Sequence, residues 1–511
     1  MIANAVQRFS RKRSAELQCD TGTGGKVKCG RHWRKIGPTS LKEAFQMHER
    51  VLADLRTHRQ GDVLHASLCN HFSNGIQLFT EFSGIDAPAQ CLHGLASTLL
   101  VQGEIETYKI DYVSACDNSA SCRQVLLALP EIMRPHHLGL DILDRIPEDT
   151  RKEISKMAAS ARGSPAGELT ANFYVEQILE ALKCCGMASE LPQMCALHHG
   201  GGGCGCQLLR SELGADGKRR SVRVVVAGIT CTDFSYAGSK RGLQGESLMP
   251  ILTFIWSRLQ GLDDLIFIEE APAFSKVMMP LLQSTLGGIY HIESVVMCPS
   301  EIGWPMTRKR SFLRLAHRQK TRRVCAFSKS ELSAFLHTVE MTGDDFFTSE
   351  LHAKPAPRTR IWSKSTPDTE VSLAFLSEAD RARYMGQLLR SDMVTGGCND
   401  DANLTPIFNI HRTAKMSRPT RLLPSLTKRS RVLSATHKRV LCGMEHLAAM
   451  GVAVWPQIQI PSACPVHGSF DHFSDRHLKE FAGNTMNTNI MSMVLAFGLA
   501  GVELELQQPL T

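Results

Sequence analysis

Short apolar runs alternate with helix-like stretches between about residue 74 and residue 317. Runs rich in β-branched residues, such as VRVVVA at 222–227, are typical of strands buried on both faces of a parallel sheet. This alternation predicts an α/β fold with a doubly wound sheet, in which ligands bind where strands end. We expect strands at 76–79, 110–115, 222–227, 265–268, 292–297 and 311–315, a short element before Asp141, and helices at 89–100, 248–259 and 485–499.

Composition limits the class of protein. The chain has 511 residues, of which 43% are hydrophobic and 21% charged, so it can bury a sizeable core. Its length fits two to four domains, or one large α/β domain with a smaller one attached. We expect no membrane-spanning helix, because no apolar run is long enough, and no secretion, because the first residues lack an apolar signal core. The 17 cysteines are then expected to be thiols.

Positive charge is concentrated in one region. The net charge is +8 overall, whereas residues 306–440 hold 25 Lys and Arg against 12 Asp and Glu, a net +13, which leaves about −5 elsewhere. Such a region is either a solvated basic face or a module that binds a polyanion. The segment RFSRKRS near the start is a nuclear address, a phosphate-contacting arm or a simple basic tail. We expect a nuclear location, with the cytoplasm left open.

Composition shifts divide the chain into four parts. Residues 1–72 are a polar, basic extension with a helix near 40–56, and 73–317 are the α/β body, interrupted by an insertion at 150–221 with a helical patch at 173–183. Residues 318–480 are irregular, basic and rich in Pro, Ser and Thr. Residues 481–511 return to a helix that completes the body.

Three groups of reactive side chains follow predicted strands of the body. Cys231 stands after the 222–227 strand and before a glycine-rich loop; it is either an activated thiol or a buried structural one. Glu269 and Glu270 end the next strand, and since side chains alternate, only one of them should face a given cleft. Arg308 and Arg310 precede the 311–315 strand and are expected to share a face, which suits an oxygen-rich or anionic ligand. Solvated loop residues are the alternative interpretation of each pair.

The order and spacing of these blocks resemble the cytosine-C5 methyltransferase family. LFTEFSGID (78–86) resembles the family's F-x-G-x-G-G block, TCTDFSYAGSKRG (230–242) its P-C-Q-x-F-S-x-A-G block, IEEAP (268–272) its E-N-V block and PMTRKRSF (305–312) its Q-x-R-x-R block. LCGMEHLAAMG (441–451) resembles the segment that closes the recognition region, and AGNTMNTNIMSMVLAFGLA (482–500) the C-terminal G-N-S-V block. The resemblance covers about 73–317 and 441–500.

This resemblance implies a Rossmann-like, S-adenosylmethionine-dependent methyltransferase sheet in 73–317 and a smaller target-recognition domain in 318–480. Cys231 matches the nucleophile, and Glu269 the carboxyl group that acts on N3 of the base. Arg308 and Arg310 match the arginines that orient the nucleophile and hold the cytosine O2.

The resemblance also implies a set of cofactor-binding residues. Phe79 and Gly84 match the first block, and Asp117 matches the acidic neighbourhood after the second strand. Asp141 matches the aspartate that contacts the adenine amino group, and Asn484 matches the asparagine of the last block. The implied cofactor is S-adenosyl-L-methionine, and no metal is expected.

Several positions depart from the family patterns. Thr230 and Thr232 replace the proline and glutamine beside the nucleophile, Glu270 replaces the asparagine of E-N-V, and Met306 the glutamine of Q-x-R-x-R. Glu81 and Ser83 replace glycines when the first block is read from Phe79, and Ala115 stands where an acidic residue binds ribose. The nucleophile, the acid and both arginines are present, which favours a divergent active enzyme.

The implied function is methyl transfer to C5 of cytosine in DNA through a covalent bond between the cysteine and C6. RNA, including transfer RNA, is an alternative substrate, and a non-catalytic nucleic-acid-binding protein is an alternative of another class. A nicotinamide-dependent oxidoreductase lacks its G-x-G-x-x-G fingerprint here. DNA is the expected partner, with no membrane and no obligate protein partner.

A second group of cysteines and histidines lies in the insertion. Four glycines separate its histidines from the next cysteine, and no C-x-x-C pair is present, so we expect a loop rather than a zinc site. The group comprises Cys184, Cys185, Cys195, His198, His199, Cys204 and Cys206.

Overall fold

The structure is a computed structural model. It describes residues 34–163, 167–184, 195–197, 221–229, 232–234, 238, 241–242, 245–348, 377–395, 407–411, 420–434, 436–437, 439–455 and 466–505. Residues from Ile36 onward form one compact unit, and all elements below belong to it. Among the described helices, none combines the length and apolar character needed to cross a bilayer.

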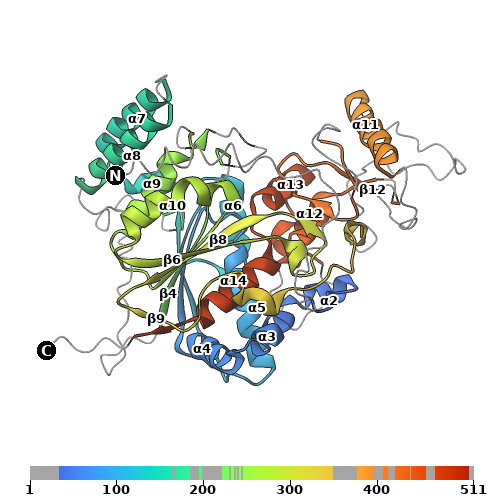
Figure 1. Cartoon of the computed structure of the whole chain (residues 1–511), viewed down its shortest axis with the longest axis horizontal. Helices are drawn as coiled ribbons and strands as arrows, with labels where there is room; N and C mark the ends of the chain where they lie inside the picture. The colour runs from blue at the N-terminus through green and yellow to red at the C-terminus, as the bar shows by residue number, and fades with distance from the viewer. Residues whose placement is uncertain are drawn as a thin grey trace, which may run out of the picture. The chain divides into compact units, whose positions relative to one another are not determined.

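A seven-stranded sheet forms the centre of this unit, with the strand order β3-β2-β1-β4-β5-β8-β6 (Figure 1). The first five strands in this order are mutually parallel, and β8 is antiparallel to both β5 and β6. This is the doubly wound, Rossmann-like α/β sheet that the sequence predicts. The strands are β1 (Ile76–Glu81), β2 (Ile110–Cys116), β3 (His137–Gly139), β4 (Val222–Gly228), β5 (Leu265–Glu270), β6 (Tyr290–Met297) and β8 (Arg310–His317).

Side chains that alternate along the strands belong to two hydrophobic clusters, one on each face of the sheet. In β4, Val222, Val224 and Val226 belong to the first cluster, whereas Val225 and Ala227 belong to the second. The helices that contribute to the first cluster are α2 (Leu41–Phe45), α3 (Met47–Arg56), α4 (Gly61–Asn74), α5 (Ala87–Val101), α6 (Ala120–Ala128), α12 (Gly443–Ala449), α13 (Asp475–Asn484) and α14 (Thr488–Ala500).

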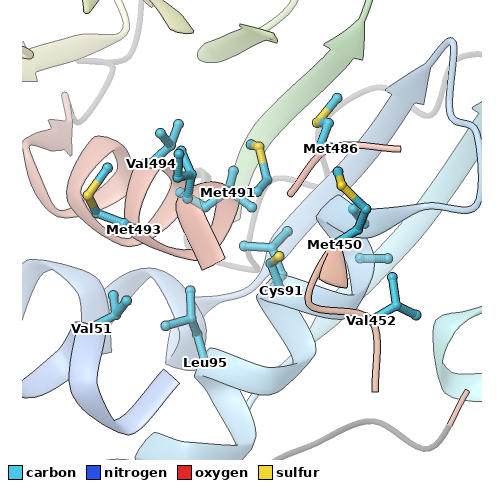
Figure 2. Packing of buried hydrophobic residues seen from close by; sticks show 14 of the residues in the cluster. Val51, Cys91, Leu95, Met450, Val452, Met486, Met491, Met493 and Val494 are labelled. Atoms are coloured by element: carbon cyan, nitrogen blue, oxygen red, sulfur yellow. The ribbon is translucent and has the colours of Figure 1, made fainter. Parts of the chain in front are cut away.

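Helix α14 is buried along its whole length and packs against α3, α4 and α5. Figure 2 shows this packing: Met491, Met493 and Val494 of α14 lie among Val51 of α3 and Leu95 of α5. The predicted helix at 485–499 therefore exists and forms part of the centre of the protein. A helix with apolar residues all round its axis requires such burial.

The second cluster lies on the opposite face and includes the insertion. Its helices are α7 (Glu148–Gly163), α8 (Gly167–Cys184), α9 (Leu248–Arg258) and α10 (Pro272–Leu286). Ile154 of α7 and Ile178 of α8 are fully buried there, and α8 packs against α9. The predicted helical patch at 173–183 thus lies within α8.

The predicted N-terminal extension contributes more to the main hydrophobic core than its polar composition indicates. The predicted extension 1–72 includes α2, α3 and most of α4, whose buried residues Phe45, Leu52 and Leu68 belong to the main core. These helices are amphipathic, so a polar average composition conceals one apolar face. The parts of 1–72 before Arg34 lie outside the described residues.

Only a fraction of the described part of 318–480 forms a core of its own. Tyr384 of α11 (Glu378–Thr395) packs with residues of β10 (Ile407–Asn409), β12 (Val432–Ser434) and β13 (Arg439–Val440), a small antiparallel sheet. Other segments join the main body, as when β9 (Thr321–Arg323) pairs with β14 (Val502–Leu504) and β11 (Leu423–Pro424) pairs with β7 (Met306–Thr307). The boundary of a separate recognition domain stays a prediction.

Candidate active site

The candidate residues gather where β1, β4 and β5 end. β1 and β4 lie side by side in the sheet although β2 and β3 come between them in the chain, so the strand order reverses at this point. Open α/β sheets bind ligands at such a switch point. Register places Glu81 of β1 opposite Ala227 of β4, and Gly228 of β4 opposite Glu269 of β5. The exits of the three strands are therefore side by side.

Glu269 and Arg310 form an ion pair at this edge. β8 runs antiparallel to β5, and Glu270 lies opposite Ser311, so the start of β8 meets the end of β5. The Nε of Arg310 lies 2.9 Å from Oε1 of Glu269, and the two side chains are only 15% and 10% exposed. The structure thus brings together two of the four residues predicted to be catalytic.

The neighbouring carboxyl group of Glu270 is in a different environment. Glu270 is 1% exposed, and its Oε2 accepts a hydrogen bond from the main-chain N–H of Ala271 at 2.5 Å. Burial raises the pKa of Glu270 well above its usual value. Both carboxyl groups are thus buried, but only Glu269 is paired with Arg310. The prediction that only one of the two faces a given cleft stays a prediction.

Arg308 connects three segments through main-chain carbonyl oxygens. Its Nη1 donates to Leu426 O at 2.9 Å, its Nη2 donates to Thr485 O at 3.1 Å, and both nitrogens lie 3.4–3.5 Å from Gly483 O. The side chain is 4% exposed. These contacts fit a residue that positions the site better than one that contacts a substrate, although the sequence predicted the same surroundings for Arg308 and Arg310.

Cys231, the predicted nucleophile, lies outside the described residues, as does Thr230. The segments on either side of it are described. Ile229 follows β4 and is buried, and on the other side Asp233 accepts hydrogen bonds from the N–H and hydroxyl of Ser247, at 2.9 and 2.5 Å. Phe234 packs edge-to-face on Phe274 of α10 with ring centroids 5.2 Å apart. Both flanks of the cysteine are therefore anchored to the body.

The loop between β1 and α5 has the geometry of a ligand-binding turn. Gly84 has a left-handed φ of +57°, and its N–H donates to Asp117 Oδ2 at 2.7 Å. A methyl group placed on Gly84 would meet nothing nearer than the main-chain oxygen of Asn484, at 4.0 Å. The second oxygen of Asp117 accepts from Ser119 N–H at 2.8 Å, and burial raises the pKa of Asp117.

The other predicted cofactor residues border this loop. Asp141 follows β3, caps the short helix Ile142–Arg145 through Leu143 N–H at 2.9 Å, and is half-buried. Asn484 ends α13 and is exposed, with its carbonyl oxygen towards Gly84. The glycine turn is thus flanked by the half-buried carboxyl groups of Asp117 and Asp141, whose oxygens can accept hydrogen bonds from hydroxyl and amino groups.

Phe79 does not have the environment predicted for it. It lies inside β1, is 3% exposed, and is covered by the guanidinium of Arg223, 4.1 Å from the ring centroid. Phe82 is the aromatic residue of the turn, with a φ of +53°. Reading F-x-G from Phe82 aligns Gly84 directly and puts Asp86 at a glycine position, a signal in the sequence that the choice of Phe79 missed.

Asp86 was also missed by sequence reasoning. It has a φ of +61°, caps α5 through Ala89 N–H at 3.5 Å, and is fully buried. Burial raises the pKa of Asp86 to about 7, and the hydroxyl of Tyr112 lowers it in part. The same hydroxyl lies 2.6 Å from Thr80 Oγ1, which contacts Ser83 Oγ at 2.7 Å. A buried network of polar side chains, which includes Thr80, Ser83 and Tyr112, therefore packs beneath the turn.

Glu81 heads a second buried network beneath the turn. It forms an ion pair with Arg145 at 2.7 Å, and Arg258 lies 3.6 Å away. Arg258 and Arg223 both bind Asp263, at 2.9 Å. Burying a charged carboxylate requires such partners, which are distant in sequence here and could not be foreseen from it.

Most of the cysteine and histidine group in the insertion lies outside the described residues. Of its members, Cys184 is exposed at the end of α8, and the main-chain N–H of Leu138 lies 3.4 Å from Cys195 Sγ. Cys185, His198, His199, Cys204 and Cys206 are not among the described residues. The expectation of a loop rather than a zinc site stays a prediction.

Another trio with metal-ligand chemistry occurs among the described residues. His58, Cys325 and Glu331 place ligand-type atoms within 4.8 Å of one another. His58 Nδ1 accepts the N–H of Gln60, so Nε2 carries the proton and donates to Glu331 at 3.0 Å. Arg59 pairs with the same carboxylate. In this arrangement the three side chains are linked by hydrogen bonds, because Glu331 also accepts from the thiol of Cys325 at 3.6 Å.

Comparison with known proteins gives likenesses only among solved structures. No family model matches the chain, and no curated protein matches its sequence. The chain is similar to the Dnmt2 methyltransferase of Schizosaccharomyces pombe (10% identity, 82% of this chain and 97% of that chain, TM-score 0.41) and to the methyltransferase EhMeth of Entamoeba histolytica (12%, 83% and 98%, 0.37). The chain is also similar to a mutant of Spodoptera frugiperda DNMT2, with 10% identity, coverage of 83% of this chain and 99% of that chain, and a TM-score of 0.37.

Proposed function

We propose that this protein transfers a methyl group from S-adenosyl-L-methionine to C5 of cytosine in DNA. The observation that carries the proposal is the ion pair of Glu269 and Arg310 at the end of β5. Gly228, which lies opposite Glu269, is three residues before Cys231 in the chain. An acid and a cation from separate strands thus meet beside the end of β4, and Cys231 follows that strand in the chain.

These groups suit the chemistry of cytosine. C5 is a weak nucleophile, and attack of the Cys231 thiolate at C6 forms an S–C6 bond and makes C5 nucleophilic. Glu269 stabilises N3 as charge develops there, and Arg310 fixes the orientation of that carboxyl group. After C5 gains a methyl group it loses its proton, and the electrons of the C–H bond expel the thiolate from C6. The ring is then aromatic again and the cysteine is regenerated.

S-adenosylmethionine supplies an electrophilic methyl group when it is bound. Gly84, with Asp117 and Asp141, would hold its nucleoside part through the open turn and the two carboxylates. Asn484 would border the same turn from α13. Arg308 keeps α13 in place, because it binds the carbonyl oxygens of Gly483 and Thr485.

Basic residues next to the pair would bind the phosphates of a nucleic acid. Lys309 lies between the two arginines and is exposed. Lys428 and Arg429 are exposed in the turn after Leu426, whose carbonyl oxygen binds Arg308. Neither Lys309 nor Arg429 has an acidic partner among the described residues, whereas Lys428 lies 3.4 Å from Glu480. A base within a duplex must be turned out to reach such a site, and backbone contacts hold the nucleic acid meanwhile.

RNA, including transfer RNA, is the alternative substrate, since phosphate contacts do not distinguish the two polymers. A non-catalytic protein that binds nucleic acid is the alternative of another class, supported by Thr230, Thr232 and Ala115 at positions where the family patterns have other residues. A nuclear location accompanies the DNA proposal.

Transfer of a labelled methyl group tests these alternatives together. Purified full-length protein is incubated with labelled S-adenosylmethionine and, separately, with cytosine-containing duplex DNA and with transfer RNA. Label on C5 of cytosine in DNA supports the proposal, and label in RNA alone supports the alternative substrate. No label in either polymer and no heat of S-adenosylmethionine binding by calorimetry would support the non-catalytic alternative.

A further inference from the structure

Two carboxyl groups stand next to each other at the end of β5, but only one has a cation of its own. Arg310 directs its Nε to Glu269. Arg308, the other nearby cation, is bound to the carbonyl oxygens of Leu426, Gly483 and Thr485. An ionised Glu270 would therefore have to compete for a guanidinium that is already engaged.

The surroundings of Glu270 disfavour a negative charge. Glu270 is 1% exposed, and its Oε2 already accepts the N–H of Ala271. Its Oε1 is buried and has no hydrogen-bond donor among the described residues. Opposite it on β8 lies Ser311, which is fully buried and whose hydroxyl is bound to that of Ser275 on α10. A buried carboxylate oxygen without a donor costs far more than a buried neutral acid.

We propose that Glu270 is a positioning residue that keeps a proton on Oε1 and so leaves Arg310 to pair with Glu269 alone. The location of the proton follows from the hydrogen bonds: Oε2 accepts from Ala271, so Oε1 carries the hydrogen. The charged groups that influence Glu270 are Glu269, which opposes its ionisation, and Arg310 and Arg308, which favour it. Burial outweighs both arginines and raises the pKa of Glu270.

The charge of Glu270 does not depend on what the protein does. Its consequence for catalysis rests on the proposed function: loss of the proton would put a second anion beside Glu269 and draw Arg310 away. Methyl transfer would then fall in alkaline solution, and Glu270→Gln, which cannot ionise, would lack that fall. Glu270→Ala would not reproduce the effect of glutamine, because it leaves a void next to Ser311.

Infrared spectroscopy of the full-length protein tests the protonation directly. At about pH 7, the difference spectrum of wild type minus Glu270→Gln is expected to contain the carbonyl stretch of a protonated carboxylic acid. The matched control is Glu293→Gln, because Glu293 is paired with Arg314 at 2.6 Å and should contribute only a carboxylate band. Equal spectra for wild type and Glu270→Gln in the acid region would overturn the proposal.

A second measurement keeps the test independent of the folding of the variant. Carbon-13 NMR of wild-type protein labelled at the glutamate carboxyl carbons should contain one buried signal that keeps the shift of a protonated acid at about pH 7. If every glutamate signal has the carboxylate shift, the proposal is wrong. A protonated signal together with absent methyl transfer would refute the proposed function and leave this inference standing.

Discussion

Arg310 Nε lies 2.9 Å from Oε1 of Glu269, although the two residues belong to different strands, and both side chains are mostly buried. The antiparallel pairing of β5 and β8 creates this contact, because it brings the end of one strand to the start of the other. A carboxyl group held in this way has a fixed orientation beside the exit of β4. The proposed mechanism depends on that orientation.

Arg310→Met should lower methyl transfer by about 100-fold or more, because Glu269 loses the group that orients it. Removing one partner of a buried pair also costs about 3–5 kcal/mol, to be reduced here for partial exposure. Turnover numbers and urea unfolding measure the two effects separately. Turnover equal to wild type would remove Arg310 from the mechanism.

Arg308→Met should destabilise the protein by about 2–5 kcal/mol, since it leaves buried carbonyl oxygens without donors. The matched control is Arg134→Met: Arg134 is exposed and donates to one carbonyl oxygen, that of Leu129, at 3.0 Å. We expect the control to change the free energy of unfolding by less than about 0.5 kcal/mol. Equal effects of the two variants would show that the carbonyl contacts of Arg308 contribute nothing.

Replacing Lys309 and Arg429 by alanine should weaken nucleic-acid binding and make it less sensitive to salt. Each lost phosphate contact lowers the slope of log K against log salt by about 0.9 on duplex DNA, so the double variant should lose about 1.8. The control replaces Lys42 and Lys109, which are also exposed; Lys109 precedes β2 and so lies at the opposite edge of the sheet. An unchanged slope in the first variant would refute the assignment of this surface.

Asp86, in the loop between β1 and α5, should make the free energy of unfolding depend on pH. Burial raises the pKa of Asp86 from 3.8 to about 7, so the folded state binds the proton more tightly than the unfolded state. The contribution of Asp86 to the free energy of unfolding is fully present below about pH 4 and is lost as the pH rises through about 7. The total loss is on the order of 4 kcal/mol. Asp86→Asn keeps a capping side chain that tolerates a left-handed φ and should lack this loss. Parallel urea-unfolding curves for the two proteins from about pH 4 to about pH 8 would contradict the prediction.

Much of the fold could be predicted because buried parallel strands have a strong local signal. The run VRVVVA, rich in β-branched residues, lies in β4, and the apolar run LIFI lies in β5. The positions of Glu269 at the end of one strand and of Arg310 at the start of another also follow from local patterns, whereas their pairing depends on the antiparallel register of β5 and β8. These features depend on sequence neighbours, which a single chain reveals.

Contacts between distant segments could not be predicted in the same way. The carbonyl partners of Arg308 come from segments near 426 and 483–485, and the first of these lies in a region without a recognisable motif. The choice of Phe79 over Phe82 shows a different limit: two phenylalanines three residues apart both precede the glycine of the turn, and only packing distinguishes them. Phe79 is in the core beneath Arg223, and Phe82 is in the turn.

The most direct test of the account is covalent trapping. Full-length protein is incubated with S-adenosylmethionine and duplex DNA that contains 5-fluorocytosine, in which fluorine replaces the proton that must leave C5. We predict a denaturation-resistant adduct in which mass spectrometry of the peptides places the modified base on Cys231, and Cys231→Ala should bind the same DNA without forming it. The absence of any adduct from protein that transfers methyl groups to ordinary DNA, or an adduct on another residue, would contradict the account.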